Sequence, residues 1–352
     1  MKYGRTLLDL ASELERQMTT KRDMIVPTPL LHHETRADGS SRITVETPDG
    51  TRAFETTDNF RRQLAEKIGI PFKYFERMRE DQPALLDQNI HTWLREEPEQ
   101  RMVRTLDGRA RAFLSDRYRR LDNYDLLQHV FPILETLPGA RFESVELTDT
   151  KLFLKVVTPR EFEMQPGDIV QAGIVVSNSE TGHGTLSVQQ LLFRLICRNG
   201  LIAPDSALRK THVGRLSEAS TEEVMLFQDD TLAADDTAFF LKVRDVVQAA
   251  VAEATFVTSC QKMQRTLGIK LTGDPAKAVE TLGVRYLFNE TERAGVLRRL
   301  IQGADLTGYG LVNAVTHFAQ EVESYDRSTE LEAVAGKMID QSNAQWNAVA
   351  TA

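Results

Sequence analysis

The sequence predicts an α+β fold, in which an antiparallel sheet of hairpins and a meander is backed by helices and followed by an all-helical region. Apolar and β-branched residues alternate with polar ones in several short segments before residue 203. After residue 216 the alternation gives way to helical apolar spacing. The chain has 352 residues, of which 41% are hydrophobic, enough for about two domains. We therefore expect a hairpin-rich α+β domain at 1–203 and a helical region at 217–352.

Helices and hairpins alternate in the first part of the chain. Apolar residues three and four apart predict the helices, whose ends are set by capping residues, glycine and proline. These helices are expected at 7–18, 57–68, 71–78, 83–95 and 122–137. Two hairpins lie between them, one over 42–54 around Pro48-Asp49-Gly50 and one over 101–115 around Asp107-Gly108.

Longer strands and then helices follow. Alternating apolar residues predict a four-stranded antiparallel meander, with strands at 142–147, 151–157, 169–179 and 185–197. Residues 222–264 contain neither proline nor glycine and predict a long helix, broken near 229–236. Shorter helices are expected at 276–281, 291–301, 308–323 and 329–339.

Composition excludes several classes of protein. The net charge of -8 argues against a protein that coats nucleic acid with its whole surface, so any such surface must be local. Cys197 and Cys260 are too few for a disulfide framework or a cysteine zinc site. The N-terminus lacks the apolar core of a signal peptide, and no run of 18 apolar residues occurs. We therefore expect a cytoplasmic protein.

Positive charge is concentrated at residues 101–120, which contain seven Arg and only two Asp. Guanidinium groups that alternate along a strand can meet successive phosphates, and an aromatic ring among cations can stack on a base. Solvated strand ends, or ion pairs with the acidic remainder, are the structural alternative. The candidate nucleic-acid-binding residues are Arg104, Arg109, Arg111, Arg117, Tyr118, Arg119, Arg120, Arg194 and Arg198.

Two further basic groups extend this hypothesis. Residues 194–215 hold five cations and one Asp, and residues 61–79 hold six cations and two Glu. A single positive groove results if the three groups share a face. Helix amphipathicity explains the group at 61–79 equally well.

No motif in the chain predicts catalysis. Phosphate-binding loops, dinucleotide fingerprints, nucleophile elbows and CxxC pairs are missing from the sequence. His32, His33 and Glu34 are metal-ligand types, but adjacent residues point in different directions, so a polar loop is the better interpretation. Acidic pairs at 229–230 and 235–236 are typical of a helix surface.

His183 lies in a glycine-rich turn near Ser177, Ser179 and Glu180. Hydroxyl, imidazole and carboxylate groups can form a hydrolase site, but turn chemistry explains this composition without catalysis. We expect no catalytic residue, no metal ion and no cofactor.

Four segments together resemble the phage/plasmid-like proteins grouped as domain of unknown function 932: GIPFKYFERM at 69–78 and longer stretches at 107–127, 173–202 and 307–336. The resemblance implies a mobile-element protein with a context in recombination or replication, and it supplies no catalytic residue. The hairpin sheet is also similar, at the level of fold, to the ring-forming single-strand annealing proteins of phages.

The preferred hypothesis is a non-enzymatic phage or plasmid protein that binds single-stranded nucleic acid and acts in annealing. The alternative is a protein-interaction factor, such as a virion or host-takeover component, without nucleic-acid binding. A hydrolase centred on His183 and Ser177 is the third hypothesis. An open edge strand also predicts a homo-oligomer.

Overall fold

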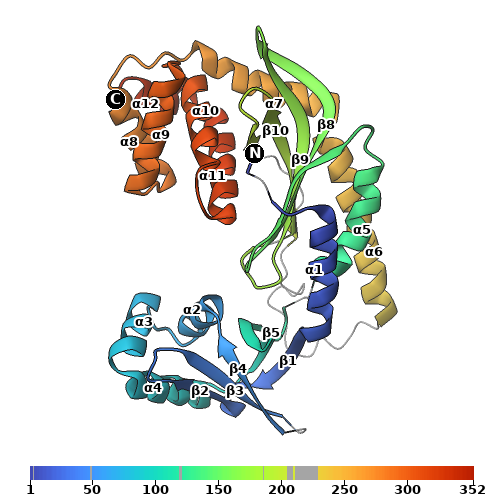
Figure 1. Cartoon of the computed structure of the whole chain (residues 1–352), viewed down its shortest axis with the longest axis vertical. Helices are drawn as coiled ribbons and strands as arrows, with labels where there is room; N and C mark the ends of the chain where they lie inside the picture. The colour runs from blue at the N-terminus through green and yellow to red at the C-terminus, as the bar shows by residue number, and fades with distance from the viewer. Residues whose placement is uncertain (3, 48–49, 119–120, 185, 204–208, 211–228) are drawn as a thin grey trace.

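The computed structural model describes residues 1–2, 4–47, 50–118, 121–184, 186–203, 209–210 and 229–352, with the backbone alone at 209–210 and 229–236. Two sheets, their covering helices and a C-terminal group of helices make up the molecule (Figure 1). The predicted α+β fold is confirmed, whereas most of the expected domain boundary lies outside the described residues. Within these ranges, no helix has both the length and the apolarity needed to cross a bilayer.

The first sheet has the strand order β1-β5-β6-β4-β3-β2, with three helices on one face (Figure 1). The strands are β1 (Arg22–Pro27), β2 (Leu31–Thr35), β3 (Ser41–Thr47), β4 (Gly50–Thr56), β5 (Gln100–Leu106) and β6 (Arg109–Ser115). The helices are α2 (Asp58–Lys67), α3 (Phe72–Asp81) and α4 (Pro83–Glu96). Phe60, Phe75 and Ile90 bring these helices onto the sheet. Asp107 and Gly108, with φ of 51° and 72°, form the predicted hairpin turn.

Residues 32–34, which we expected to be a polar loop, instead form part of the edge strand β2. Strand β3 pairs with one side of β2. On the other side, the N–H of His33 donates to Nε2 of His91 at 3.0 Å and the N–H of Thr35 donates to Oδ2 of Asp87 at 2.9 Å. Side chains of α4 therefore accept the hydrogen bonds of backbone N–H groups on the unpaired edge of β2. These acceptors are distant in sequence, so the local sequence did not indicate a strand and the loop expectation is wrong.

The second sheet has the order β11-β10-β9-β8-β7, entirely antiparallel, and β12 also pairs with β10. Its strands are β7 (Arg141–Leu147), β8 (Leu152–Gln165), β9 (Asp168–Asn178), β10 (Leu186–Arg194), β11 (Asn199–Ile202) and β12 (Arg209–Lys210). One face packs against α1 (Leu7–Thr20), α5 (Asn123–Glu135) and α6 (Asp229–Ala250) (Figure 1). Buried Leu191, Phe193 and Ile202 form a separate cluster with Ala333, which belongs to the C-terminal helices.

The C-terminal helices pack together beside the second sheet (Figure 1). They are α7 (Glu253–Arg265), α8 (Pro275–Tyr286), α9 (Glu290–Gly303), α10 (Gly308–Ala319), α11 (Tyr325–Ile339) and α12 (Asn343–Ala350). Of the long helix expected over 222–264, the described part is interrupted between α6 and α7 and not within 229–236, because α6 continues from Asp229 to Ala250 and α7 begins at Glu253. Side chains of Gln190 and Arg160 donate to the carbonyls of Ala250 and Val251, which ends the helix without proline or glycine.

We predict that Asp87→Ala lowers the free energy of unfolding by about 2 kcal/mol, because it leaves buried donors of β2 without an acceptor. Asp87 accepts from Nδ1 of His33 at 2.7 Å and from the N–H and hydroxyl of Thr35. Urea denaturation measures the change. The matched control is Asp81→Ala, which removes only an exposed pair with Arg77. Equal midpoints for the two variants would contradict the role of Asp87.

Candidate functional site: the cleft between the two sheets

A cleft of about 540 Å³ lies where the two sheets meet. It is bordered by α1, the β5–β6 turn, the start of α2, the β7–β8 turn and the β9–β10 loop. Its basic lining residues are Arg5, Arg16, Arg109, Arg111 and Lys151. Its acidic lining residues are Glu13, Asp58, Asp107, Asp149 and Glu180. The cleft therefore gathers ten formal charges from segments far apart in the sequence.

The inner wall of the cleft is a buried ion-pair network centred on Glu180, whose side chain is 2% exposed. Oε1 of Glu180 accepts from Nζ of Lys21 at 3.0 Å and from the N–H of Asn123 at 2.6 Å. Oε2 accepts from Nη2 of Arg111 at 2.5 Å. Burial by itself raises the pKa of Glu180, but the charges of Arg111 and Lys21 outweigh it, so the net pKa is lowered. Glu180 is thus held as an anion.

Arg104 is the second member of this network, and its side chain is 0% exposed. Its guanidinium donates to both carboxylate oxygens of Asp23, at 3.0 and 2.9 Å, and to Oδ1 of Asp122 at 2.5 Å. Nη1 also donates to the carbonyl of Glu180 at 2.9 Å. Lys21 pairs with Asp122 at 2.9 Å. Among the described residues, the three cations Lys21, Arg104 and Arg111 thus face the three carboxylates of Asp23, Asp122 and Glu180, and the charges of these six side chains cancel.

The outer rim of the cleft is held by Arg16, which joins α1 to the β5–β6 turn. Arg16 forms ion pairs with Glu13 and with Asp107, both at 2.8 Å. Hydrogen bonds from Arg16 lower the pKa of Glu13 and of Asp107 to about 2. Arg5 pairs with Glu146 at 2.9 Å.

Two basic side chains of the cleft have no ion-pair partner in the described part of the chain: exposed Arg109 and half-buried Lys151. The other basic side chains that line the cleft are paired with Glu13, Asp107, Glu146 or Glu180. Asp58 pairs with Arg61, outside the cleft. Among the described residues, Arg109 and Lys151 are therefore the cleft cations that no carboxylate pairs with.

The structure brings only part of the predicted binding set together. Arg109 and Arg111 line the cleft, while Arg104 is buried behind it. Arg117 is exposed, and the hydroxyl of Tyr118 donates to the carbonyl of Ser179 at 3.0 Å. Arg119 and Arg120 lie outside the described residues.

Arg194 and Arg198 lie on another part of the second sheet and are paired. Arg194 makes two contacts of 2.6 Å with Asp168, and Arg198 contacts Glu143 at 2.7 Å. Of the other basic groups, Arg61 and Arg79 share Glu76, and the side chains of Arg209 and Lys210 are outside the described part.

Sequence reasoning missed Arg5, Arg16 and Lys151 as lining residues. Lys151 directly follows the predicted Thr-Asp-Thr turn, and Arg16 lies on the predicted first helix. The signal available was a cation next to a predicted turn, but only the fold shows which turns meet.

The predicted hydrolase arrangement is not assembled around His183. The ring Nε2 of His183 contacts Oδ1 of Asn59, and its backbone N–H donates to Oγ of Ser179 at 2.9 Å. Ser177 lies within β9 and pairs with Ser187. Burial lowers the pKa of His183, and the nearby charges of Lys151 and Arg62 lower it further. In the described part of the chain, no three His, Cys, Asp or Glu side chains form a group that could hold a metal ion.

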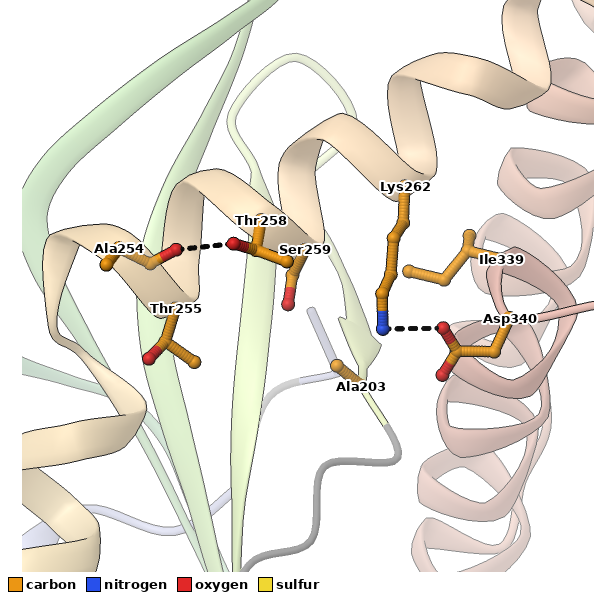
Figure 2. A pocket seen from close by; sticks show the side chains of 8 residues that line it. All are labelled: Ala203, Ala254, Thr255, Thr258, Ser259, Lys262, Ile339 and Asp340. Atoms are coloured by element: carbon orange, nitrogen blue, oxygen red, sulfur yellow. Dashed lines mark hydrogen bonds and ion pairs between the residues drawn. The ribbon is translucent and has the colours of Figure 1, made fainter.

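A second hollow, of about 360 Å³, lies between α7 and α11 (Figure 2). Lys262 and Asp340 face each other across it at 2.9 Å. Ser259 donates to Oε1 of Gln190 at 2.5 Å. Thr258, Ser259, Lys262 and Asp340 thus already have partners, so we assign no function to this hollow.

The fold and the cleft define a two-sheet α+β protein with a charged cleft and no recognised catalytic motif. Residues 111–346, about two thirds of the chain, match the family described as Domain of unknown function (DUF932), and the chain belongs to this family. Neither the curated proteins nor the solved structures yielded a match.

We predict that the buried network makes stability fall in acid. Burial by itself raises the pKa of Asp122, but Arg104 and Lys21 outweigh it and hold the pKa below its usual value of 3.8. The unfolded chain therefore binds a proton that the folded chain does not, so the free energy of unfolding falls as the pH drops below about 4.

Urea denaturation at several pH values tests this effect with Asp122→Asn. The variant should lose about 3 kcal/mol at neutral pH, because Arg104 and Lys21 lose a buried partner. It should also depend less steeply on pH below about 4. Asp149→Asn, at an exposed cleft residue, is the matched control and should behave like wild type. Identical acid profiles for wild type and Asp122→Asn would contradict the prediction.

Proposed function

We propose that this chain is a non-enzymatic phage- or plasmid-type protein that binds single-stranded nucleic acid in the cleft between its two sheets. The unpaired charges of Arg109 and Lys151 in one cleft carry the proposal. Phosphate groups are the ligands that such cations bind in nucleic acids. Binding of a single strand fits a role in annealing during recombination or replication, which the family resemblance supports.

The proposal separates the predicted arginines into two roles. Arg109 binds phosphate directly, with Arg111 beside it where Glu180 neutralises part of its charge. Arg104 is a positioning residue, because its buried guanidinium holds the wall of the cleft. Exposed Arg117 is available for a further phosphate contact.

We predict that Arg109→Ala combined with Lys151→Ala weakens binding of labelled oligothymidylate, measured by fluorescence anisotropy over a series of KCl concentrations. Each phosphate contact adds about -0.7 to the slope of log K against log salt, so the double variant should lose about 1.4 in slope. Unfolding midpoints should stay close to wild type, because neither side chain has an ion pair in the described structure.

The matched control is Arg265→Ala combined with Lys277→Ala, which removes the same charge from exposed positions on α7 and α8. It should retain the wild-type slope. Affinity that does not vary with salt, or an equal loss in both double variants, would remove the proposal.

A protein-interaction factor is the alternative, and an exposed apolar pair on the helical region favours it. Val284 and Leu287 are 66% and 83% exposed and lie three residues apart. Isolated apolar side chains are common on surfaces, so a pair carries less weight than two unpaired cations in one cleft. Failure of the oligonucleotide titration would leave this alternative as the preferred function.

We also propose a homo-oligomer formed through β1. This strand ends the first sheet, and Ile25 on it is 58% exposed. By contrast, α4 satisfies the opposite edge at β2. A bare edge strand commonly pairs with another chain.

We predict that Ile25→Lys converts an oligomer into a monomer, measured by size-exclusion chromatography with light scattering. A wild-type monomer, or an unchanged mass in the variant, would contradict this interface.

A further inference from the structure

We propose that a third pocket, between the β10–β11 turn and helices α9 and α10, binds a small phosphate-bearing molecule through Arg194, Arg299 and His317. This pocket has a volume of about 280 Å³ and shares no lining residue with the cleft between the sheets. The inference is independent of the proposed nucleic-acid binding.

The pocket has room for a ligand because small residues line it. Gly303, Gly310 and Ala314 come from the end of α9 and the first turns of α10. A Cβ added to Gly303 would meet no atom within 4 Å. The longer polar side chains around this floor belong to Arg194, Arg299, Gln302, Asn313 and His317.

Arg194 is held in one orientation before any ligand arrives. Its Nε and Nη2 donate to the two oxygens of Asp168, each at 2.6 Å. Tyr309 donates to the same carboxylate at 2.6 Å, and the guanidinium lies 5.6 Å from the centre of the Tyr309 ring. Nη1 makes no hydrogen bond to Asp168 and donates instead to Sγ of Cys197, another residue that lines the pocket, at 3.5 Å. A fixed donor loses little entropy when it binds an anion.

Arg299 contributes positive charge that its partner does not fully neutralise. Arg298 and Arg299 both pair with Glu321, so two guanidinium groups share one carboxylate. Asp305 is the single acidic residue that lines the pocket in the described structure, and its Oδ1 accepts from Thr307 at 2.7 Å. The lining side chains thus carry two positive charges and one negative charge.

His317 lies close enough to Arg194 and Arg299 for their charges to act on it, and it supplies a neutral hydrogen-bond donor. Burial lowers its pKa, the charges of Arg299, Arg194 and the N-terminal amine lower it further, and Glu321 opposes them. A neutral imidazole donates one N–H, so it can bind phosphate oxygen without adding charge. Two guanidinium groups and an imidazole N–H are suited to a phosphate group, whose oxygens accept from several directions.

The two cysteines allow a direct test in the intact wild-type protein. Cys197 lines the pocket and is half-buried, whereas burial raises the pKa of the Cys260 thiol to about 12. Iodoacetamide should therefore modify Cys197 first, and mass spectrometry of its peptide gives the rate. Inorganic phosphate should slow this reaction beyond KCl of equal ionic strength, by about twofold at the dissociation constant. No slowing beyond KCl overturns the proposal.

Arg299→Gln and Arg298→Gln form a matched pair, because both side chains contact Glu321 and only Arg299 lines the pocket. Phosphate protection of Cys197 should disappear in Arg299→Gln, which removes a donor that lines the pocket, and should weaken less in Arg298→Gln, which leaves Glu321 to Arg299 alone. Equal loss in both variants overturns the proposal. In wild type, the pKa of His317 measured by NMR should rise when phosphate is added, and an unchanged pKa also counts against the site.

One further comparison separates two sources of the phosphate group. A 5′-phosphorylated dinucleotide that protects Cys197 better than inorganic phosphate assigns the pocket to the end of a nucleic-acid strand. Equal protection assigns it to a free small phosphate. If neither compound protects beyond matched KCl, no phosphate ligand binds there.

Discussion

The two sheets are held together by the buried carboxylate of Glu180. It lies on the β9–β10 loop of the second sheet, yet Arg111 comes from the first sheet and Lys21 from the segment that joins α1 to β1. Arg104 extends the network to Asp23 and Asp122. A buried charge without partners is costly, so the sheets are stable in this arrangement only while each cation faces its carboxylate. The walls of the cleft follow from that requirement.

This constraint changes the meaning of the basic stretch at 101–120. On a protein with a net charge of -8, seven arginines in twenty residues suggest a binding strip. In the fold, Arg104 and Arg111 belong to the ion-pair network between the two sheets, whereas Arg109, at the hairpin turn, is exposed to solvent. The same hairpin therefore supplies both the paired arginines that hold the wall of the cleft and the exposed Arg109, which has no ion-pair partner among the described residues. Neutral pairs contribute little attraction at a distance, so long-range attraction of a polyanion depends on the few unpaired cations.

Local patterns predicted the elements better than their contacts. Alternation located the meander, and Asp107-Gly108 located the hairpin turn, because both signals act over a few residues. The strand at His32 was missed, since its edge is satisfied by Asp87 and His91 more than fifty residues away. The end of α6 was misplaced for the same reason, because Gln190 and Arg160 reach it from the sheet. The partners of Arg104 and Arg194 are also distant in sequence, so residue type alone could not separate structural from accessible cations.

The family match begins inside the region where the two sheets meet. The matched region begins at Arg111, inside β6, and therefore contains Glu180 and Asp122 but neither Lys21 nor Arg104. Strand β6 would also lose its neighbours β4 and β5. The region defined by sequence similarity is consequently smaller than the part of the chain that these contacts hold together. Any piece cut at that limit would expose an uncompensated acid and two bare strand edges, and would be prone to aggregate.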